Sequence, residues 1–461
     1  MGVLFTGMFM ALLDQSVVTV ALPSIRTTLD ASGAALSWTI SGYMLAFGLA
    51  LIPSGRLGDR IGHKRVFMIG IGVFTLASLA CALAVTPEYL VASRIVQGLG
   101  GGIFLPAVTA FIQLLFTDRD RGRAFAIMGG VIGAALALGP IVGGLLISGL
   151  GDENGWRAVF MINLPIGVVA LVAAAVLLPA PEQRGSTLGL DGVGLAILAL
   201  ALIALLVPLV EAQAAGWPVW SFVLFGAGVA LLALFAVWEG SFARRGRTPL
   251  VPPRLFARGA FRGGAILALV YFAALPGALF AVSLLWQAGL GHSALESGLV
   301  GTPFALGSIL GALRSGRLAD RLGRAVLVWG VGMVAAGYAS VSILVAVIEP
   351  ERLAGWMLAL PLFVAGAGSG LSIGPNARFA IATVERGDAG VASGVINTMQ
   401  RLGTAVGIAI VSSVLFGVLS GSADVAVYAR GAATAIAVCA GLAAVAFVFV
   451  FALPKRLPLP A

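Results

Sequence analysis

Asp14 is the only acidic side chain in the middle of a long apolar segment of this sequence. If that segment is a helix that begins near residue 3, the carboxyl group lies about 16 Å from its start. Apolar surroundings favour the neutral acid, whereas a nearby cation favours the carboxylate. A carboxyl group balanced between these effects can take up a proton on one side of an apolar barrier and release it on the other. The alternative is a structural carboxylate that its neighbours satisfy.

Two basic side chains, Arg94 and Arg401, also lie within apolar segments. Arg94 falls about one or two helical turns from the expected level of Asp14, and Gln97 follows it by nearly one turn. We therefore expect Asp14 and Arg94 to form a proton-coupling pair, with Gln97 in the same hydrogen-bonding network. Arg401 lies about 12 residues into its own segment, near the middle. A purely structural role for either arginine is the alternative.

The sequence carries no constellation typical of an enzyme. The two cysteines, Cys81 and Cys439, lie inside apolar runs, and the two histidines are His63 and His292, so we expect no disulfide framework and no metal site. No loop combines a nucleophile with a base, and the phosphate-binding pattern GxxxxGK[ST] is absent, which excludes an ATP-driven pump. We expect no catalytic residues and no cofactor.

The composition indicates a membrane protein. Hydrophobic residues make up 60% of the chain and charged residues 10%, against about 45–50% and about 25% in soluble domains. The mean hydropathy is +1.06. The net charge of +9 is spread over several short loops, which argues against a nucleic-acid partner. The first apolar run has no basic segment or cleavage site before it and contains Asp14, so we expect it to be retained as a membrane helix.

Apolar segments long enough to cross a bilayer core of about 30 Å recur along the whole chain. We predict an all-α polytopic protein with fourteen such helices. Their expected ranges are about 3–24, 36–55, 66–86, 89–112, 124–149, 157–179, 190–211, 219–239, 262–288, 297–315, 325–347, 353–376, 389–418 and 430–453.

The basic residues predict the orientation. With the N-terminus in the cytoplasm, only four of the 28 Lys and Arg residues fall on the opposite side, namely Arg26, Arg157, Arg352 and Arg430. Arg94 and Arg401 fall within helices, and the remaining 22 lie on the cytoplasmic side. This asymmetry is what the positive-inside rule requires, and it predicts that both termini are cytoplasmic.

A short loop sequence occurs twice. Residues 55–65 read GRLGDRIGHKR and residues 316–324 read GRLADRLGR, 261 residues further on. Such a repeat implies that the surrounding helical unit is duplicated, with two extra helices between the copies. We therefore predict an N-terminal six-helix half (1–180), two inserted helices (181–245) and a C-terminal six-helix half (246–461).

Five motifs in this order resemble those of the major facilitator superfamily, and the fourteen helices together with the first motif narrow the resemblance to its drug:proton antiporter-2 family. The match covers essentially the whole chain. The motifs are LDQSVVTVALPSI (13–25), GRLGDRIGHKR (55–65), RIVQGLGGG (94–102), GAALALGPIVGG (133–144) and WRAVFMINLPIG (156–167). In this family the arginine corresponding to Arg94 lines a central cavity and is implicated in proton transfer.

The resemblance implies a conformational latch in the repeated loop. There an aspartate pairs with a helix dipole and an arginine in one conformation and releases them in another. Simple solvated charges that set the topology are the alternative. The candidate latch residues are Gly55, Asp59, Arg60, Gly62 and Arg65, with Asp320 in a weaker version of the same role.

The glycine-rich motif between residues 133 and 144 is typical of close helix packing in lipid. Pro140 favours a kink, so a hinge at this helix is compatible with packing. The resemblance associates this motif with exporters. The candidate packing and hinge residues are Gly133, Gly139, Pro140, Gly143 and Gly144.

A transporter of this kind binds its substrate in an apolar and aromatic cavity. The candidate cavity residues are Gln97, Tyr43, Phe47, Phe104, Tyr271, Phe272, Phe304, Asn397 and Arg401. The family order around Asn397 commonly places the arginine one position earlier, and one residue turns a side chain by about 100°. The facing of Arg401 is therefore open.

The resemblance implies a proton-coupled exporter of lipophilic drugs or antibiotics that works by alternating access in a bacterial inner membrane. Its partners would be the substrate, protons and the lipid bilayer, and we expect a monomer. A dedicated exporter of an endogenous metabolite, lipid or peptide, an importer or facilitator, and a non-transporting receptor or scaffold on the same fold are the alternatives.

Overall fold

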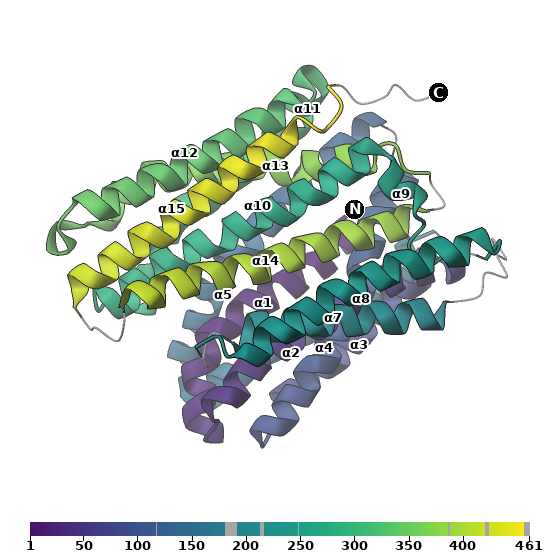
Figure 1. Cartoon of the computed structure of the whole chain (residues 1–461). Coiled ribbons are helices and arrows are strands. Elements are labelled where there is room, and N and C mark those ends of the chain that lie inside the picture. The colour runs from purple at the N-terminus through teal and green to yellow at the C-terminus, as the bar shows by residue number, and fades with distance from the viewer. Residues whose placement is uncertain are drawn as a thin grey trace. The chain divides into compact units, whose positions relative to one another are not determined.

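The computed structural model describes residues 1–116, 118–179, 191–212, 216–247, 249–385, 388–419 and 424–455, and the regular structure within them is helical (Figure 1). The predicted all-α class is confirmed. The basic residues Arg184, Arg386 and Arg456, which entered the topology prediction, lie outside these ranges.

The first four helices lie over the expected segments, and the next two together cover the fifth and sixth. They are α1 (Gly2–Leu29), α2 (Gly33–Ile61), α3 (His63–Ala82), α4 (Pro87–Leu115), α5 (Asp118–Met161) and α6 (Asn163–Leu177). The helix α5 is interrupted at Gly151, where φ is 75°. The predicted boundary between its two segments, at residues 149–157, coincides with this break.

The remaining helices begin at residue 192. They are α7 (Gly192–Glu211), α8 (Val219–Arg244), α9 (Arg254–Ala257), α10 (Gly259–Leu284), α11 (Ala294–Leu322), α12 (Ala325–Val347), α13 (Ala359–Ile381), α14 (Ala389–Leu419) and α15 (Val425–Val450). A π-helical turn (Leu285–Gly289) extends α10, and two short 3-10 turns (Pro350–Arg352 and Gly355–Leu358) lie between α12 and α13.

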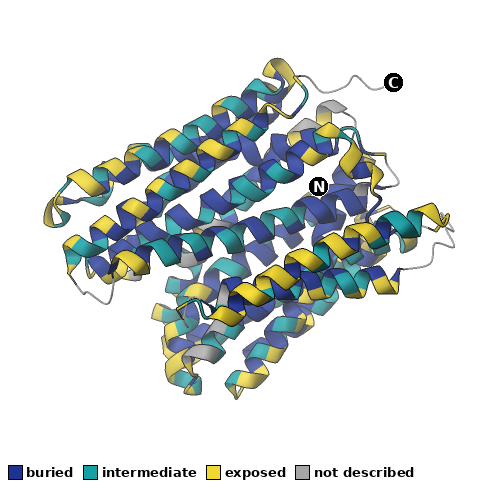
Figure 2. Cartoon of the chain, viewed as in Figure 1, coloured by how far each residue is buried: buried dark blue, intermediate teal, exposed yellow. Residues whose placement is uncertain are grey.

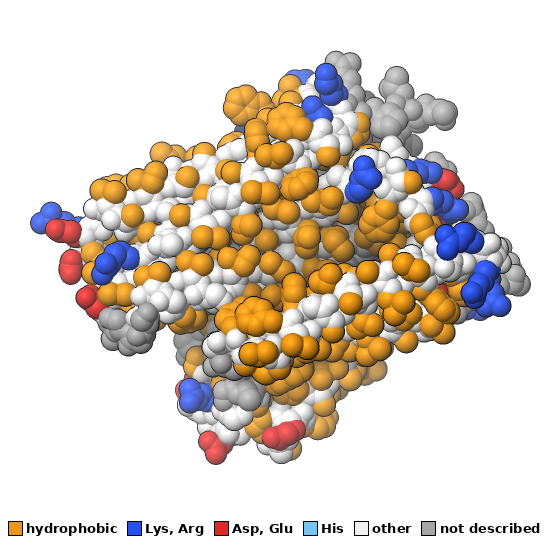
Figure 3. Space-filling view, in the orientation of Figure 1, with side chains coloured by type: hydrophobic (Ala, Val, Ile, Leu, Met, Phe, Trp, Pro, Cys, Tyr) orange, Lys and Arg blue, Asp and Glu red, His pale blue; other side chains and the backbone are white. Residues whose placement is uncertain are grey.

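Eleven helices of the described chain are long and apolar enough to cross a membrane, or up to twelve if a bent pair within α2 counts as one span. The predicted number of fourteen is therefore not confirmed. Much of α8 is exposed (Figure 2), and its exposed side chains include the large apolar Phe222, Val223 and Leu234. Apolar side chains cover the visible side of α7 and α8, and Lys and Arg gather near helix ends (Figure 3). This distribution suits a helix surface that faces lipid.

The chain forms two compact units. Unit 1 contains residues 1–115, 142–258 and 384–398, and unit 2 contains residues 116–141, 259–383 and 399–461. In unit 1, α2 and α3 both pack against α4, and α6 packs against α1 and α3. In unit 2, α11 and α12 both pack against α13, and α15 packs against α10 and α12. The same pairing pattern thus occurs in both units. The division at residues 180 and 245 stays a prediction, and α7 and α8 cluster with unit 1.

The repeated loop makes comparable turns in the two units. Gly62 (φ 95°) joins α2 to α3, and Gly323 (φ 58°) joins α11 to α12. These left-handed conformations favour glycine because a side chain would clash with the backbone. After each turn a basic side chain caps the C-terminal end of another helix in the same unit. Lys64 Nζ donates to the carbonyl oxygens of Ala175 and Leu178 at the end of α6, and Arg324 Nη1 donates to those of Phe451 and Leu453 just after α15.

Candidate functional site: a buried ionic cluster and a second cluster at the helix ends

Asp14 lies on α1 inside unit 1, and its side chain is fully buried. Both carboxyl oxygens accept hydrogen bonds. Oδ2 accepts from Arg94 Nη1 at 2.7 Å, and Oδ1 accepts from Gln97 Nε2 at 2.9 Å and from Asn163 Nδ2 at 2.8 Å. Four donor and acceptor groups from α1, α4 and α6 therefore meet inside an apolar helical bundle.

Arg94 is as deeply buried as Asp14, with 1% of its surface exposed. Besides the ion pair, Nη1 donates to Gln97 Oε1 at 2.6 Å, and Nε donates to the Thr39 backbone carbonyl on α2 at 3.1 Å. The guanidinium also lies over the Tyr43 ring, 4.1 Å from its centroid. A cation–π contact of this kind is strong where water is excluded. The cation is thus held by α2 and α4 as well as by Asp14.

Close helix packing puts Arg94 in this position. The glycines that follow Arg94 on α4 leave no room for a side chain: a methyl group on Gly98 would collide with the Tyr43 carbonyl, and one on Gly102 would collide with the Phe47 carbonyl. Small residues let two helix backbones approach in this way. The RIVQGLGGG motif therefore brings α4 against α2.

Ser78 and Asn163 complete the cluster, and neither residue was predicted from the sequence. Ser78 Oγ accepts from Gln97 Nε2 at 3.1 Å and from Asn163 Nδ2 at 3.0 Å, and donates to the Phe160 carbonyl at 2.9 Å. Asn163 is fully buried, and its Oδ1 has no hydrogen-bond partner among the described residues. An amide side chain in an otherwise apolar segment, within the motif WRAVFMINLPIG, was the available signal.

The cluster is arranged for an ionised Asp14. A carboxylate that accepts from a guanidinium and two amides is stabilised relative to the neutral acid. A proton on Asp14 would remove the charge that balances Arg94 and would turn one acceptor oxygen into a donor. Arg94 would then remain buried with only neutral acceptors, which is unfavourable. The arrangement therefore fits a carboxylate at Asp14 better than a neutral acid.

A second polar cluster, which we call the loop cluster, consists of Arg56, Asp59, His63, Asp388 and Gly390 in unit 1. Asp59 Oδ1 accepts from the Gly390 N–H, in the first turn of α14, at 3.3 Å and lies 3.3 Å from His63 Nε2. Asp59 Oδ2 is buried without a hydrogen-bond partner in the described chain. An acidic group beside a helix N-terminus is stabilised by the helix dipole. Asp59 therefore has the helix-dipole contact expected of a latch.

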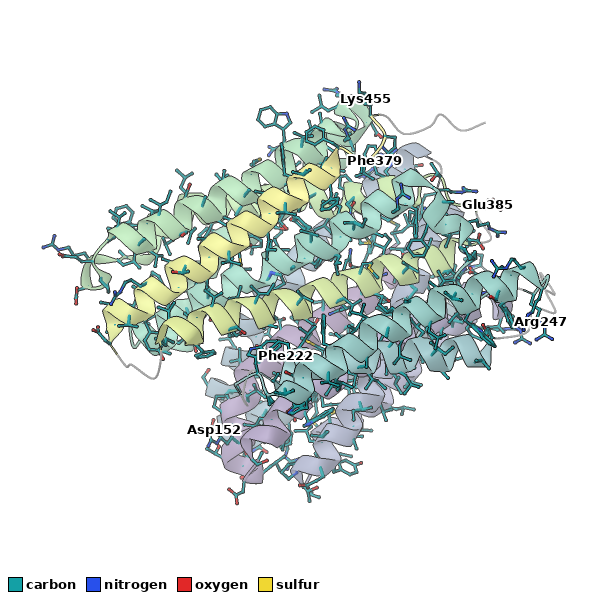
Figure 4. All side chains as sticks on the ribbon, viewed as in Figure 1. Asp152, Phe222, Arg247, Phe379, Glu385 and Lys455 are labelled. Atoms are coloured by element: carbon teal, nitrogen blue, oxygen red, sulfur yellow. The ribbon has the colours of Figure 1, made fainter. Side chains whose placement is uncertain are left out.

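Asp388 joins the loop cluster to the linker after α8. It lies 3.9 Å from Arg56 Nη1 and 2.7 Å from Arg254 Nη2, and Arg254 Nε also donates to it at 3.1 Å. The hydrogen bonds from Arg254 to Asp388 raise the pKa of that guanidinium, so it stays charged. Next to it, Arg258 pairs with Glu385 at 2.8 Å. Arg247 and Glu385 lie near one end of unit 1 and Asp152 near the opposite end (Figure 4).

The family model described as Major Facilitator Superfamily matches residues 4–291, 180–408 and 265–460. The chain belongs to the Major Facilitator Superfamily. The predicted superfamily is confirmed. Its members are multi-pass membrane transporters rather than enzymes, and this protein is one of them.

The relatives of this superfamily member include bacterial export proteins. The chain is 38% identical to the "Probable actinorhodin transporter" of Streptomyces coelicolor over 93% of its own length and 74% of the relative. It is 35% identical to the "Cephamycin export protein CmcT" of Amycolatopsis lactamdurans over 90% and 85%. The solved structure of the proton:xylose symporter XylE shares the fold, with a TM-score of 0.70 and 16% identity over 99% of this chain and 94% of that one.

The remaining latch candidates of this transporter lie in both copies of the repeated loop. Asp320, in the second copy of the loop, accepts from Arg378 Nη1 on α13 at 2.6 Å within unit 2. Arg60 and Arg65 are exposed, whereas Gly55 is buried against the Gly390 carbonyl. Their roles stay predictions.

The glycine-rich stretch of α5 packs against helices of both units, one part in each. A methyl group on Gly133 would meet Ser308 Oγ of α11 at 2.8 Å, and one on Gly143 would meet Val17 of α1 at 3.3 Å. A methyl group on Gly144 would have no neighbouring atom within 4 Å. Gly139 is buried. The side chain of Pro140 lies outside those that the structure describes. The non-helical residue of α5 is Gly151, while residue 140 is helical.

The predicted cavity residues fall into different environments. Tyr43 and Phe47 pack on each other beside Arg94, with ring centroids 5.8 Å apart. Phe104 is buried between Phe67 and Phe74 of α3. In unit 2, Tyr271 contacts Phe272 edge to face; Phe304 is buried. Asn397 donates to the Ser393 carbonyl at 2.9 Å, and Arg401 is partly exposed. A substrate contact at these residues stays a prediction.

Proposed function

We propose that this transporter is a proton-coupled efflux antiporter of the drug:proton antiporter-2 family. The observation that carries the proposal is the Asp14–Arg94 ion pair at 2.7 Å, buried with Gln97 and Asn163 inside unit 1. A buried acid of this kind in a membrane transporter is a proton-coupling site by default, because its charge has a large free-energy cost there.

The mechanism follows from the balance of charge. Asp14 takes up a proton from the outer side, which weakens its bond to Arg94 and destabilises the buried cluster of Asp14, Arg94, Gln97 and Asn163. The two six-helix halves then change their arrangement by alternating access. Release of the proton on the cytoplasmic side restores the ion pair and favours capture of the next substrate. A proton moving down 100 mV supplies about 2.3 kcal/mol, and each pH unit adds about 1.4 kcal/mol.

The direction and the substrate class rest on the relatives. The names of two of them describe an actinorhodin transporter and a cephamycin export protein. We propose that this chain exports lipophilic small molecules of the antibiotic type. A dedicated exporter of one endogenous metabolite is the second candidate, and the same two names favour it, because each refers to one compound class.

The topology belongs to the same proposal. Fourteen spans result if the break at Gly151 separates two spans, and if α2 and α11 each cross the bilayer. Both termini are then cytoplasmic in a bacterial inner membrane. Single cysteines in a Cys81/Cys439-free background test this topology. Cysteine at Glu153 or His292, both exposed, should react with an impermeant thiol reagent from outside. Cysteine at Arg65 or Arg321, also exposed, should react only after the membrane is opened. Reaction of Arg65 or Arg321 cysteine from outside, or no reaction of Glu153 or His292 cysteine there, would contradict fourteen spans.

The experiment that tests antiport uses inverted membrane vesicles whose lumen is acidified by respiration and contains a pH-sensitive dye. Actinorhodin, a cephamycin and a panel of lipophilic dyes are added in turn. We expect a substrate to alkalinise the lumen, and Asp14→Asn to abolish this response. Asp30→Asn is the matched control, because Asp30 ends the same helix on the surface in a left-handed conformation that asparagine tolerates.

Two outcomes would overturn parts of the proposal. A full response in Asp14→Asn would show that the coupling site lies elsewhere. Accumulation of a labelled substrate in the vesicles without any movement of protons would show a proton-independent exporter. A response to one compound class alone would favour the dedicated exporter over the multidrug transporter.

A further inference from the structure

Two further carboxyl groups are buried in unit 1, at one end of the α7–α8 pair. Asp191 precedes α7 and Glu239 lies in the last turns of α8, and 4% and 2% of their surfaces are exposed. Neither residue belongs to the Asp14 cluster or to the loop cluster. The sequence motifs indicate no role for α7 and α8.

Three of the four carboxyl oxygens have a donor. Asp191 Oδ1 accepts from the Gly194 N–H at 2.8 Å and caps α7, and Oδ2 accepts from Trp238 Nε1 at 2.7 Å. Glu239 Oε2 accepts from the Val251 N–H at 3.0 Å. Glu239 Oε1 is buried and has no hydrogen-bond donor among the described residues.

The unpaired oxygen of Glu239 lies beside Asp191. A methyl group placed on Gly194 would collide with both Glu239 Oε1 and Asp191 Oδ2, so both oxygens lie against the same backbone position. Both oxygens lie within 2.7 Å of that one methyl position, so the two carboxyl groups face each other and a proton shared between them would form a hydrogen bond. Two carboxyl groups can form such a bond only if one of them carries a proton.

No cation balances this pair in the part of the chain that the structure describes. Of the basic residues that flank it, Arg244 donates to Ser241 Oγ, and Arg254 pairs with Asp388. The neighbouring helix α2 directs Arg56 to Asp388 and Asp59 to His63. Two buried carboxylates without a cation repel each other strongly, which favours retention of one proton.

We propose that Asp191 and Glu239 form a second proton-binding site, in which one shared proton holds the linker after α8 against the α7–α8 pair. The linker is attached through the Val251 N–H, three residues before Arg254. Loss of the shared proton leaves two like charges at this end of α7 and α8 and loosens the Val251 contact. The contact between α8 and the segment from Val251 to Arg254, which pairs with Asp388, then depends on pH.

The test is amide hydrogen exchange of the full-length protein in detergent or nanodiscs, followed at Val251 and corrected for the intrinsic effect of pH. In the wild type, exchange at Val251 should become at least about tenfold faster as pH rises, as expected when one buried hydrogen bond opens. In Glu239→Gln the amide replaces the protonated acid and can donate to Asp191, so exchange should stay slow at all pH values.

Infrared difference spectra give a second readout that does not depend on folding stability. The carbonyl band of a buried protonated carboxylic acid should disappear from the wild type at alkaline pH and be absent from Glu239→Gln. Glu349→Gln, at an exposed carboxyl group, should leave both readouts unchanged. If Glu239→Gln does not fold, Asp191→Asn serves, since Asn can also donate to the opposite carboxyl group.

Three results would overturn the proposal. The first is Val251 exchange in the wild type that does not respond to pH. The second is a response of equal size in Glu239→Gln. The third is restoration of slow exchange at alkaline pH by sodium chloride but not by choline chloride, which would show that the pair binds a cation instead of a proton.

Discussion

Asn163 Nδ2 donates a hydrogen bond to Asp14 Oδ1 at 2.8 Å, although 149 residues separate them. The same amide nitrogen donates to Ser78, while the amide oxygen of Asn163 has no partner in the described chain. Rotation of this amide would present that oxygen to Asp14. An oxygen is an acceptor, so it suits a protonated Asp14, whereas the nitrogen suits the carboxylate. Asn163 can therefore donate a hydrogen bond to the carboxylate form of Asp14 and accept one from the protonated form.

Replacement of Asn163 tests this role. Asn163→Leu keeps the size of the side chain but removes one donor to the carboxylate, which favours the protonated form of Asp14. We expect substrate-driven proton release to require a more alkaline cytoplasmic side and to slow by about tenfold, since a hydrogen bond to a charged group contributes about 1.5–3 kcal/mol. The pH profile of the vesicle assay measures this. Asn163→Ser, which retains a small donor, should lie between wild type and Asn163→Leu, and an unchanged profile in Asn163→Leu would contradict the role.

The Asp14–Arg94 pair should show strong coupling in stability. Arg94→Met leaves Asp14 buried without its cation, and we expect a loss of about 3–5 kcal/mol. In the double variant Asp14→Asn/Arg94→Met no unpaired charge remains, so much of that loss should be recovered although transport is abolished. Thermal unfolding of the purified proteins measures the cycle. Additive losses would show that the two charges do not interact in the membrane.

Contact between α2 and α14 at the loop cluster leaves no room for a side chain on Gly390. A methyl group there would meet the Gly55 carbonyl at 2.6 Å and Asp59 Oδ1 at 2.7 Å. We expect Gly390→Ala to displace Asp59 from the helix end and to slow transport by about tenfold or more, with substrate binding unchanged. Gly441→Ala on α15 is the matched control, because nothing lies within 4 Å of a methyl group there. Equal transport rates in both variants would argue against a latch.

Lys64 and Arg324 should contribute similar amounts to stability. Each donates to two carbonyl oxygens at the end of a helix, Lys64 at 2.8 and 2.7 Å and Arg324 at 2.9 and 2.7 Å. Replacement of either by Gln should destabilise the protein by about 1–2 kcal/mol. Because the two residues lie in different units, the double variant should show the sum of the two effects. Chemical unfolding in mixed micelles measures this, and a strongly non-additive result would indicate that the two caps are coupled.

Much of the fold was predictable because it depends on local patterns of composition. A long apolar segment predicts a membrane helix wherever it occurs, so α1 to α4 lie over their expected segments. The repeated loop predicted the duplication, and the same helix pairing occurs in both units. The count of fourteen spans was not confirmed, since length and hydropathy identify eleven or twelve.

The sequence by itself determined that Asp14, Arg94 and Gln97 belong together, because an ionisable residue in an apolar helix needs a partner and few were available. Only the tertiary structure decided which other groups complete the cluster. Asn163 and Ser78 come from α6 and α3, and their contact with Asp14 and Gln97 depends on how four helices pack rather than on any local pattern. The carboxyl pair of Asp191 and Glu239 depends on packing in the same way, since a hydrogen bond between distant residues leaves no periodic signal in the chain.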